Sequence, residues 1–386
     1  MKNIYLDYAS STYIDPLVLK KMTPYLKGYF GNPSSLHKMG RKSKSIIEKA
    51  RFDVAKILNA KPEEIIFTGS GTESDNLAIY GVAKSYKNKG KHIIVSKIEH
   101  SAVIEITKKL ERDGFEVDYT SVDSNGLIKI PELKKLIKPS TILISIMLAN
   151  NEIGTIQPIA EISKIIKKIN PSLLLHTDAA QATGAITLNA NKLGVDLMSL
   201  NGSKIYGPKG IGCLYVKSGI KLEPIIVGGE QEKNLRAGTE NTPLIVGFAE
   251  ALKLATKLMY KENARLVNLR DYFIKNVLKS IPNCRLNGHP TKRLPSNINI
   301  SIKGVEGESL ILMLDKFGIF ASTGSACGSS NLKPSHVISA INISPELSHS
   351  NIRFTLGRKT TKQEIDFVIK ILPRVVAKLR MISSIK

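Results

Sequence analysis

The stretch SLNGSKIYGPKGIGCLYV, residues 199–216, decides which kind of α/β fold the chain can form. It places Lys204 between an apolar run and a tight YGPKG loop, whose glycines and proline restrict the backbone. Lys204 could be an ordinary surface charge, a phosphate ligand or an amine that bonds covalently to a carbonyl group. The covalent role requires partial burial, because desolvation lowers the pKa of an ammonium group and frees its amine as a nucleophile. Lys204, next to a predicted strand, fits that role better than Lys209 within the loop.

Outward from this stretch, short apolar runs alternate with helical patterns. Runs in the first half of the chain indicate strands at residues 63–68, 92–96, 115–120, 141–147 and 174–178. Segments between them, such as SAVIEITKKLERDG and IAEISKIIKKI, have the period of amphipathic helices. Continuous apolar strands separated by helices predict a mostly parallel sheet covered on both faces. The binding site of such a sheet is expected at the carboxyl ends of its strands.

The pattern changes after residue 243. A long helical segment over 243–280 is expected to connect two domains, and an α+β segment with the strands NINISI and NIRFTL follows it. A chain of 386 residues exceeds one compact core. We predict a large domain over 15–260 and a small domain formed by 1–14 and 261–386.

Composition excludes several classes of protein. Hydrophobic residues make up 42% of the chain, which is enough for a core, yet no apolar run reaches the length of a membrane span. The first residues, MKNIYLDYASSTYIDP, lack the apolar stretch of a signal peptide. Three scattered cysteines form neither a disulfide framework nor a cysteine-rich metal site. We therefore predict a cytoplasmic protein without a membrane span.

The net charge of +23 raises the question of nucleic-acid binding. The lysines are spread over nearly every amphipathic segment, without a basic tail or a basic patch interleaved with aromatic residues. A lysine-rich bias on solvated helix faces accounts for this pattern, so direct binding of nucleic acid is not expected. Attraction to an acidic partner or to RNA stays open as the alternative.

Two further motifs follow predicted strands. TGSGTESDN (68–76) opens a helix, so its glycines and the helix N-terminus could bind a phosphate or form a simple capped turn. HTDAAQATG (176–184) places Asp178 at a strand end, where the carboxylate could cap a helix or pair with a protonated ring nitrogen. A phosphate-binding turn, this aspartate and Lys204 together fit pyridoxal phosphate (PLP), because they would hold its phosphate, ring nitrogen and aldehyde.

Motifs along nearly the whole chain occur in one order: YLDYASST, FGNPSSLH, FTGSGTESDNLAI, SKIEHSAV, NNEIGTIQPI, HTDAAQATG, KIYGPKGIG, RAGTEN, VEGESL, STGSACGSS and SNIRFTLGR. In these motifs the chain resembles the cysteine desulfurases of the NifS/IscS type, which are class-V, fold-type-I PLP enzymes. The resemblance implies a large domain with a mostly parallel seven-stranded sheet, a smaller α+β domain, and a homodimer with composite active sites.

The resemblance implies cofactor-binding residues from several parts of the chain: Gly71, Thr72, His100, Asn151, Asp178, Gln181, Asn201, Ser203, Lys204 and Thr239. Lys204 would bond to the PLP aldehyde, Asp178 would pair with the ring nitrogen, and Gln181 would contact the ring hydroxyl. Thr72 would bind the phosphate, and Thr239 would reach the phosphate held by the partner subunit.

The resemblance also implies the catalytic residues Lys204, Cys327 and His100. His100, in SKIEH, would stack on the cofactor ring and transfer protons. Asn151, in NNEIG, would contact cofactor and substrate, and Arg353 would bind the substrate carboxylate through its planar guanidinium. No resident metal is implied, although Cys327 could ligate an iron–sulfur cluster transiently.

Cys327 lies in the segment ASTGSACGSSNLKPS. A free cysteine is usually small and buried, but the Ser, Gly, Ala and Asn neighbours are typical of an exposed loop. Reactive thiols need access and a lowered pKa, and in the family this loop carries the sulfur-accepting cysteine. Cys213, in an apolar strand, and Cys284, beside a loop, are not expected to be catalytic.

One run departs from the family pattern. Related enzymes usually read Ser-Gly-His-Lys before IYGPKG, whereas this chain has Asn201, Gly202, Ser203 and Lys204. Asn201 and Ser203 can donate hydrogen bonds to a phosphate, but a possible imidazolium charge is absent. A lower affinity for the cofactor is therefore expected.

The implied reaction converts L-cysteine to L-alanine and forms a persulfide on Cys327, for transfer to an iron–sulfur scaffold or a tRNA-thiolation protein. A selenocysteine lyase or a class-V aminotransferase would share many of these residues, although an aminotransferase would not need Cys327. A cofactor-free binding protein of the sulfur pathway is the alternative from another class. The run at Asn201 and Ser203 motivates that alternative, and retention of Lys204 and Asp178 opposes it.

Overall fold

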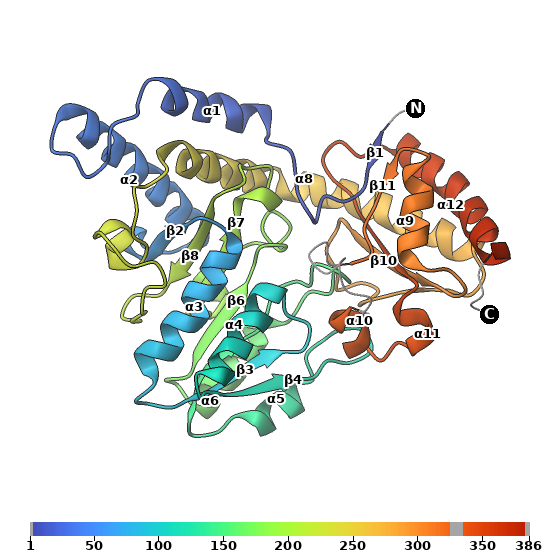
Figure 1. Cartoon of the computed structure of the whole chain (residues 1–386), viewed down its shortest axis with the longest axis horizontal. Helices are drawn as coiled ribbons and strands as arrows, with labels where there is room; N and C mark the ends of the chain where they lie inside the picture. Colours follow the sequence, from blue (N-terminus) through green and yellow to red (C-terminus); the bar gives the residue numbers. More distant parts are fainter. Residues whose placement is uncertain (1–2, 325–334, 383–386) are drawn as a thin grey trace.

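The computed structural model describes residues 3–324 and 335–382. Within these residues, the largest sheet has seven strands in the order β2-β8-β7-β6-β5-β3-β4 (Figure 1). The strands are β2 Ile65–Thr68, β3 His92–Ser96, β4 Glu116–Thr120, β5 Thr141–Ser145, β6 Leu174–Asp178, β7 Leu197–Asn201 and β8 Gly212–Val216. Pairings from β7 through β4 are parallel, and β8 is antiparallel to both β2 and β7. The predicted mostly parallel sheet is confirmed.

The reversal at β8 follows from the short connection after β7. A 3-10 turn, η2 (Gly202–Lys204), and the YGPKG loop join the two strands. A parallel pairing would need a crossover of a dozen or more residues, which this connection lacks. Tyr206 and Gly210 have positive φ angles of 62° and 79°, as a tight reversal requires. Lys204 is thereby fixed at the carboxyl end of β7.

Helices cover both faces of this sheet. The helices that precede or join its strands are α1 Pro16–Lys27, α2 Lys38–Leu58, η1 Pro62–Glu64, α3 Gly71–Tyr86, α4 Ser101–Arg112, α5 Ile130–Leu136, α6 Ile159–Ile169 and α7 Ala190–Leu193. Successive strand residues pack into different apolar cores, with Ile94 in one and Ile93 and Val95 in the other. This alternation explains why β3 is buried at every position and why it reads as a continuous apolar run.

A long helix, α8 (Thr242–Ser280), joins this part of the molecule to a smaller one (Figure 1). Asn241 caps it by accepting a hydrogen bond from the amide of Leu244 at 3.3 Å. One end of α8 packs against α1 and α2, and the other packs against α12 (Lys362–Ile382). The helix predicted over 243–280 is confirmed. Among the helices of the described residues, none combines the length and apolar character needed to cross a membrane.

The smaller part contains an antiparallel sheet of β9 (Cys284–Leu286), β10 (Asn297–Ile302) and β12 (Asn351–Thr355) in the order β12-β10-β9. The turn η3 (Gln231–Asn234) lies against β2 in the larger part. The remaining elements are β1 Ile4–Tyr5, α9 Gly307–Asp315, β11 Ile319–Phe320, α10 His336–Ala340 and α11 Pro345–Ser348. β1 pairs in parallel with β11, which brings the start of the chain into this part (Figure 1). The exact domain boundaries stay a prediction.

Candidate active site

One cavity gathers side chains from the carboxyl ends of the parallel strands, where the sequence predicts the site. It has a volume of about 220 Å³. Its lining is Ala9, Ser10, Gly71, Thr72, Asp75, His100, Met147, Asn151, Asp178, Ala180, Gln181, Asn201, Lys204 and Arg353. Residues far apart in the sequence therefore meet, and most of the predicted site residues are among them.

The start of helix α3 forms one wall of the cavity. Ser70 caps the helix by accepting a hydrogen bond from the amide of Glu73 at 3.1 Å. A Cβ atom on Gly71 would lie 3.1 Å from Cβ of Asn201, so glycine lets the helix start approach β7 closely. Thr72 follows in the first turn. Free amides at a helix start, together with this hydroxyl, suit an anion such as a phosphate.

Asn201 and Ser203 form an interlocked pair beside that helix start. Oδ1 of Asn201 accepts hydrogen bonds from the amide and the hydroxyl of Ser203, both at 3.2 Å. Nδ2 of Asn201 lies 3.3 Å from the place that a Cβ of Gly71 would take. The amide group of Asn201 is thus oriented with its nitrogen toward α3, whereas the hydroxyl of Ser203 is directed at Asn201.

Lys204 lines the cavity from the connection between β7 and β8. Its Nζ donates hydrogen bonds to the carbonyl oxygens of Ala9 at 2.9 Å and Ser10 at 2.6 Å. Nε2 of Gln181 donates to the same Ala9 carbonyl at 2.9 Å. The segment around Ala9 therefore contacts two predicted cofactor residues at once.

Two buried carboxyl groups share the cavity. Asp178 is 7% exposed, and its Oδ1 accepts a hydrogen bond from the amide of Ala180 at 2.8 Å. Burial raises the pKa of Asp178, while the charges of His100 and Lys204 oppose that rise. The pKa of Asp75 is raised well above its ordinary range, first by burial and then by the charge of Asp178. We assign the proton to Asp75 and the negative charge to Asp178, which faces the two basic groups.

His100 has a defined protonation pattern. It caps helix α4, with Nδ1 accepting a hydrogen bond from the amide of Ala102 at 3.1 Å. Burial lowers the pKa of His100 below its ordinary value of 6.5; the charge of Asp178 acts against this and that of Lys204 adds to it. The imidazole is therefore neutral at pH 7. Because Nδ1 is an acceptor, its proton is on Nε2.

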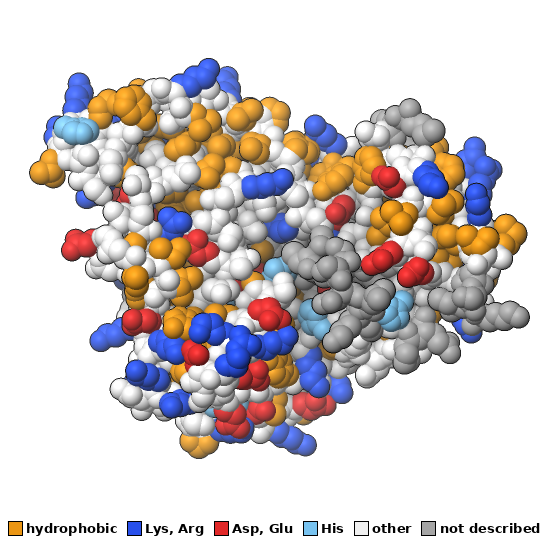
Figure 2. Space-filling view, in the orientation of Figure 1, with side chains coloured by type: hydrophobic (Ala, Val, Ile, Leu, Met, Phe, Trp, Pro, Cys, Tyr) orange, Lys and Arg blue, Asp and Glu red, His pale blue; other side chains and the backbone are white. Residues whose placement is uncertain are grey.

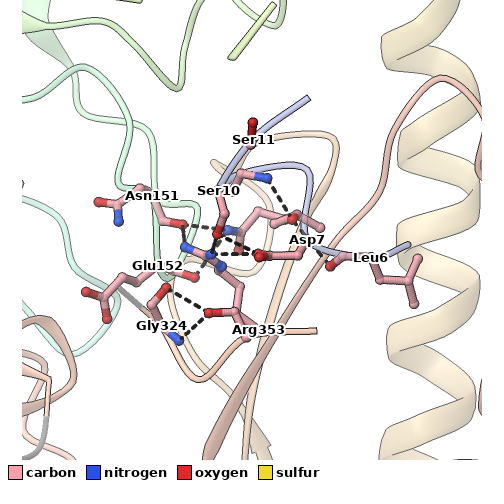
Figure 3. Close-up of polar contacts among 12 residues, drawn as sticks. Leu6, Asp7, Ser10, Ser11, Asn151, Glu152, Gly324 and Arg353 are labelled. Carbon is pink, nitrogen blue, oxygen red and sulfur yellow. Dashed lines mark hydrogen bonds and ion pairs between the residues drawn. The ribbon is translucent and has the colours of Figure 1, made fainter. Parts of the chain in front are cut away.

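Arg353 on β12 closes the cavity from the smaller part of the molecule (Figure 3). It is 2% exposed. Nη1 donates to the carbonyl oxygen of Asn151 at 3.0 Å, and Nη2 donates to Oδ1 of Asp7 and Oγ of Ser10, both at 2.9 Å. Nε is buried and has no hydrogen-bond partner among the described residues. A carboxylate is the natural partner for such a donor.

Sequence reasoning missed the contribution of residues 7–10. The motif YLDYASST counts toward the family resemblance, but no role follows from it for Asp7, Ala9 or Ser10. The sequence likewise gives no separate role to Asp75, which stands within the helix-opening motif TGSGTESDN. Nothing in a single sequence signals these contacts, because Asp7 and Arg353 are 346 positions apart.

Three predicted site residues are not part of this lining. Ser203 acts on Asn201 as described, and Thr239 lines neighbouring cavities with Gly69, Arg236 and Phe30 among the described residues. Cys327 lies outside the described residues. The other two cysteines differ from a reactive thiol: Cys213 is fully buried, which raises its pKa, and burial also raises the pKa of the half-buried Cys284.

A group with the composition of a metal site lies elsewhere, at the outer edge of the seven-stranded sheet. His92, Glu116 and Asp118 bring their ligand atoms within 4.8 Å of one another. The ammonium of Lys138 lies 2.5 Å from Oε1 of Glu116 and 3.0 Å from Oδ2 of Asp118. Lys138 pairs with both carboxylates, and His92 contacts Asp118, so the group is an ion-pair network on the sheet edge.

Comparison with known proteins gives consistent relatives. Residues 4–368 match the family Aminotransferase class-V. The chain is 53% identical to "Cysteine desulfurase IscS" of Dictyoglomus turgidum over all of this chain and 97% of that protein, and 48% identical to "Cysteine desulfurase IscS" of Methanosarcina thermophila over all of this chain and 94% of that protein. A solved "NIFS-LIKE PROTEIN" superposes with a TM-score of 0.92 at 36% identity, covering 98% of this chain and all of that one. The structure "SspA in complex with cysteine" has a TM-score of 0.79 at 34% identity, covering 92% and 98%.

Proposed function

This chain belongs to the aminotransferase class-V family and is a cysteine desulfurase; from that premise we propose how its own residues act. The family implies a PLP cofactor and L-cysteine as the substrate. The observation that carries the proposal is the meeting of Lys204, Asp178 and the start of α3 in one cavity. These groups are a nucleophilic amine, a buried anion and an anion-binding helix start.

The residues present fit PLP. The N-terminus of α3 lines the cavity through Gly71 and Thr72, and the Thr72 hydroxyl would add a donor for a phosphate. The ionised carboxylate of Asp178 suits a protonated ring nitrogen, and Gln181 lies beside it in the cavity lining. When bound, PLP withdraws electrons from the carbon that carries the substrate amine.

Lys204 is the proposed base of the reaction as well as the anchor of the cofactor. The carbonyl oxygens of Ala9 and Ser10 accept hydrogen bonds from its Nζ. These carbonyls would keep Nζ inside the cavity while the substrate is bound. The same amine is then placed to remove the α-proton of L-cysteine.

His100 is the proposed proton donor near the leaving sulfur. The neutral ring carries its proton on Nε2, as the contact of Nδ1 with the amide of Ala102 dictates. A neutral imidazole can also accept a proton, so His100 could act as both general acid and general base. Because Nδ1 caps helix α4, the orientation of the imidazole ring is fixed.

Arg353 and Asn151 are proposed to bind the substrate, and Cys327 to accept its sulfur. Arg353 lines the cavity, and its guanidinium would supply charged donors for the substrate carboxylate. The thiolate of Cys327 attacks the sulfur of the substrate, an S–S bond forms, and the C–S bond breaks. Its electron pair stays with the carbon skeleton, which leaves as L-alanine after protonation. We propose an iron–sulfur scaffold or a tRNA-thiolation protein as the acceptor of the persulfide sulfur.

A homodimer is also part of the proposal. Hydrophobic side chains gather on the surface over α1 (Figure 2). Exposed members in α1 and the loop after it are Leu17, Leu19, Leu26, Tyr29, Phe30 and Leu36. Thr239 lines a cavity together with Phe30 rather than the Lys204 cavity. A second copy covering this surface would bring a Thr239 to the other copy's site.

Replacement of Lys204 tests the proposed chemistry. The purified parent protein with PLP is expected to have a visible absorption band that shifts on addition of L-cysteine, and to release sulfide in the presence of a thiol. Lys204→Ala should lose the band shift and nearly all sulfide release, a drop of at least about 10³-fold. Lys209→Ala removes an exposed lysine five positions on and should leave both unchanged.

Product analysis separates the desulfurase from its relatives. L-cysteine alone should give equal amounts of L-alanine and sulfur. Exchange of the amino group with an added keto acid would indicate an aminotransferase instead. A protein that stays colourless with excess PLP would remove the basis for every residue role above.

A further inference from the structure

The N-terminal segment holds Arg353 by a closed set of contacts (Figure 3). Nη2 of Arg353 donates to Oδ1 of Asp7 and to Oγ of Ser10, both at 2.9 Å. Oγ of Ser10 in turn donates to Oδ1 of Asp7 at 2.8 Å. The three groups form a triangle in which each member contacts the other two.

In this triangle, both N–H groups of Nη2 form hydrogen bonds, and these bonds fix the orientation of the other guanidinium nitrogens. Both hydrogens of Nη2 are engaged by Asp7 and Ser10, and one hydrogen of Nη1 is engaged by the carbonyl of Asn151. The contacts come from two separate chain segments, so they fix the plane of the guanidinium. Arg353 lines the cavity, so the plane of its guanidinium determines which of its N–H groups a ligand there would meet.

The same segment also sets the position of the lysine. The carbonyl oxygens of Ala9 and Ser10 accept hydrogen bonds from Nζ of Lys204. Thr12 adds a further link, since its amide and its hydroxyl donate to the carbonyl oxygen of Ser203 at 3.0 and 2.9 Å. One short segment thus sets the distance between Lys204, which would exchange with the substrate amine, and Arg353, which would bind the substrate carboxylate. An α-amino acid carries its amine and carboxylate on one carbon, so this spacing has to be held closely.

We propose that Asp7 and Ser10 are positioning residues that orient Arg353 for the carboxylate of the amino-acid substrate. The inference rests on the proposed role of Arg353 in binding that carboxylate. Asp7 is not part of the cavity lining, and Ser10 lines the cavity while its hydroxyl contacts Arg353 and Asp7. They act by holding a buried cation that would otherwise lack a paired charge and a fixed plane.

A competing effect has the opposite sign and makes the inference testable. Asp7 is itself a carboxylate, so it also lowers the positive field that the substrate carboxylate meets. If competition dominated, Asp7→Asn would tighten substrate binding. If orientation dominates, as we propose, Asp7→Asn weakens it, and the uncharged change Ser10→Ala weakens it in the same direction.

The experiment measures inhibition of the PLP-loaded enzyme by L-alanine and by ethylamine, which differ only by the carboxylate. Asp7→Asn and Ser10→Ala are each expected to raise the inhibition constant of L-alanine by about 3- to 10-fold, the effect of losing one hydrogen bond of ordinary strength. The inhibition constant of ethylamine should stay the same. For L-cysteine, KM should rise while kcat changes by less than about twofold.

A second aspartate–arginine pair supplies the matched control. Oδ2 of Asp15 lies 2.9 Å from Nη1 of Arg358, this pair links the same two chain segments, and the side chains of Asp15 and Asp7 are similarly exposed, at 17% and 18%. Asp15→Asn should leave both inhibition constants and the KM unchanged. Equal effects of Asp15→Asn and Asp7→Asn would reduce the result to a general loss of stability and overturn the inference.

A further variant separates this inference from the proposed function. Arg353→Lys keeps a positive charge but loses the planar guanidinium. It should weaken the binding of L-alanine more than Asp7→Asn or Ser10→Ala does. Arg353→Lys could weaken the binding of L-alanine while Asp7→Asn and Ser10→Ala leave that binding unchanged or make it tighter. In that case only the positioning role is wrong. If Arg353→Lys has no effect, the carboxylate site itself is misassigned. The cofactor absorption band of each variant reports whether it has folded.

Discussion

At the scale of single residues, His100 combines a structural and a chemical role. Nδ1 caps helix α4, and the rest of the ring lines the cavity. The sequence suggested a proton-transfer role through family resemblance. The tautomer depends on the contact of Nδ1 with the amide of Ala102, which only the three-dimensional arrangement provides.

The pH dependence of the reaction follows from this arrangement. The pKa of His100 is lowered from 6.5, chiefly by burial, in the field of Asp178, Lys204, Glu152 and His336. A neutral His100 is therefore retained on acidification until the pH falls through a value below 6.5. We expect kcat/KM for L-cysteine to be constant just above that value and to fall at lower pH, as measured by sulfide release.

The variant His100→Gln tests the assignment of that acidic limb. It should lower kcat by about 10²- to 10⁴-fold, the usual effect of losing a general acid–base. Its residual activity should no longer fall in the same pH range. An acidic limb that persists unchanged in the variant would assign the titration to another group.

At the scale of elements, one buried ion pair joins α2, β2 and the turn η3. Arg51 of α2 forms two hydrogen bonds of 2.8 Å to Glu232, and the amide of Phe67 in β2 donates to the same carboxylate at 2.8 Å. Both side chains are nearly inaccessible to solvent. Glu232 has a φ angle of 45°, so these contacts hold a backbone conformation that a non-glycine residue rarely adopts.

Removal of the charge on Glu232 should therefore be costly. Glu232→Gln leaves the buried Arg51 with only the exposed Glu48, at 3.2 Å, as a charged partner among the described residues, and we expect a loss of about 3 kcal/mol in unfolding free energy. The measurement is the urea midpoint followed by circular dichroism. Glu105→Gln, which breaks an exposed pair with Lys108, should cost no more than about 1 kcal/mol. Equal midpoints for the two variants would contradict the structural role of the buried pair.

At the scale of the whole molecule, the hydrophobic surface over α1 indicates a partner. α1 buries Val18 and Met22 against the rest of the chain, while Leu26 and Phe30 remain 57% and 80% exposed. Apolar groups of this size and number on one surface are typical of an interface. The proposed occupant is a second copy of the chain.

The oligomeric state tests that proposal. Analytical ultracentrifugation of the parent protein should give about twice the chain mass of 42.3 kDa. Phe30→Asp should weaken the dimer at least about tenfold, because it places a charge in an apolar interface. Leu312→Asp changes a comparably exposed residue on α9, in the smaller part of the molecule, and should leave the dimer intact. A parent protein that sediments as a monomer would remove the proposed contribution of Thr239.

The amino-acid sequence by itself determined the order and type of the main elements. Apolar runs at 92–96 and 174–178 formed strands with those bounds, and the segment predicted over 243–280 became one helix from Thr242. It also placed Lys204 and Asp178 at strand ends. These features depend on local periodicity and on residues close in sequence, so one sequence is enough to predict them.

Only the tertiary structure decided how distant segments complete the cavity. The contacts of Asp7 with Arg353 and of Ala9 with Lys204 span 346 and 195 positions. The pairing of β8 with β2 likewise joins segments that lie far apart in the sequence. Such contacts depend on the packing of the whole chain, and local sequence preferences carry no information about them. The physical reason is that a hydrogen bond between remote segments forms only after the cores that carry both segments have packed.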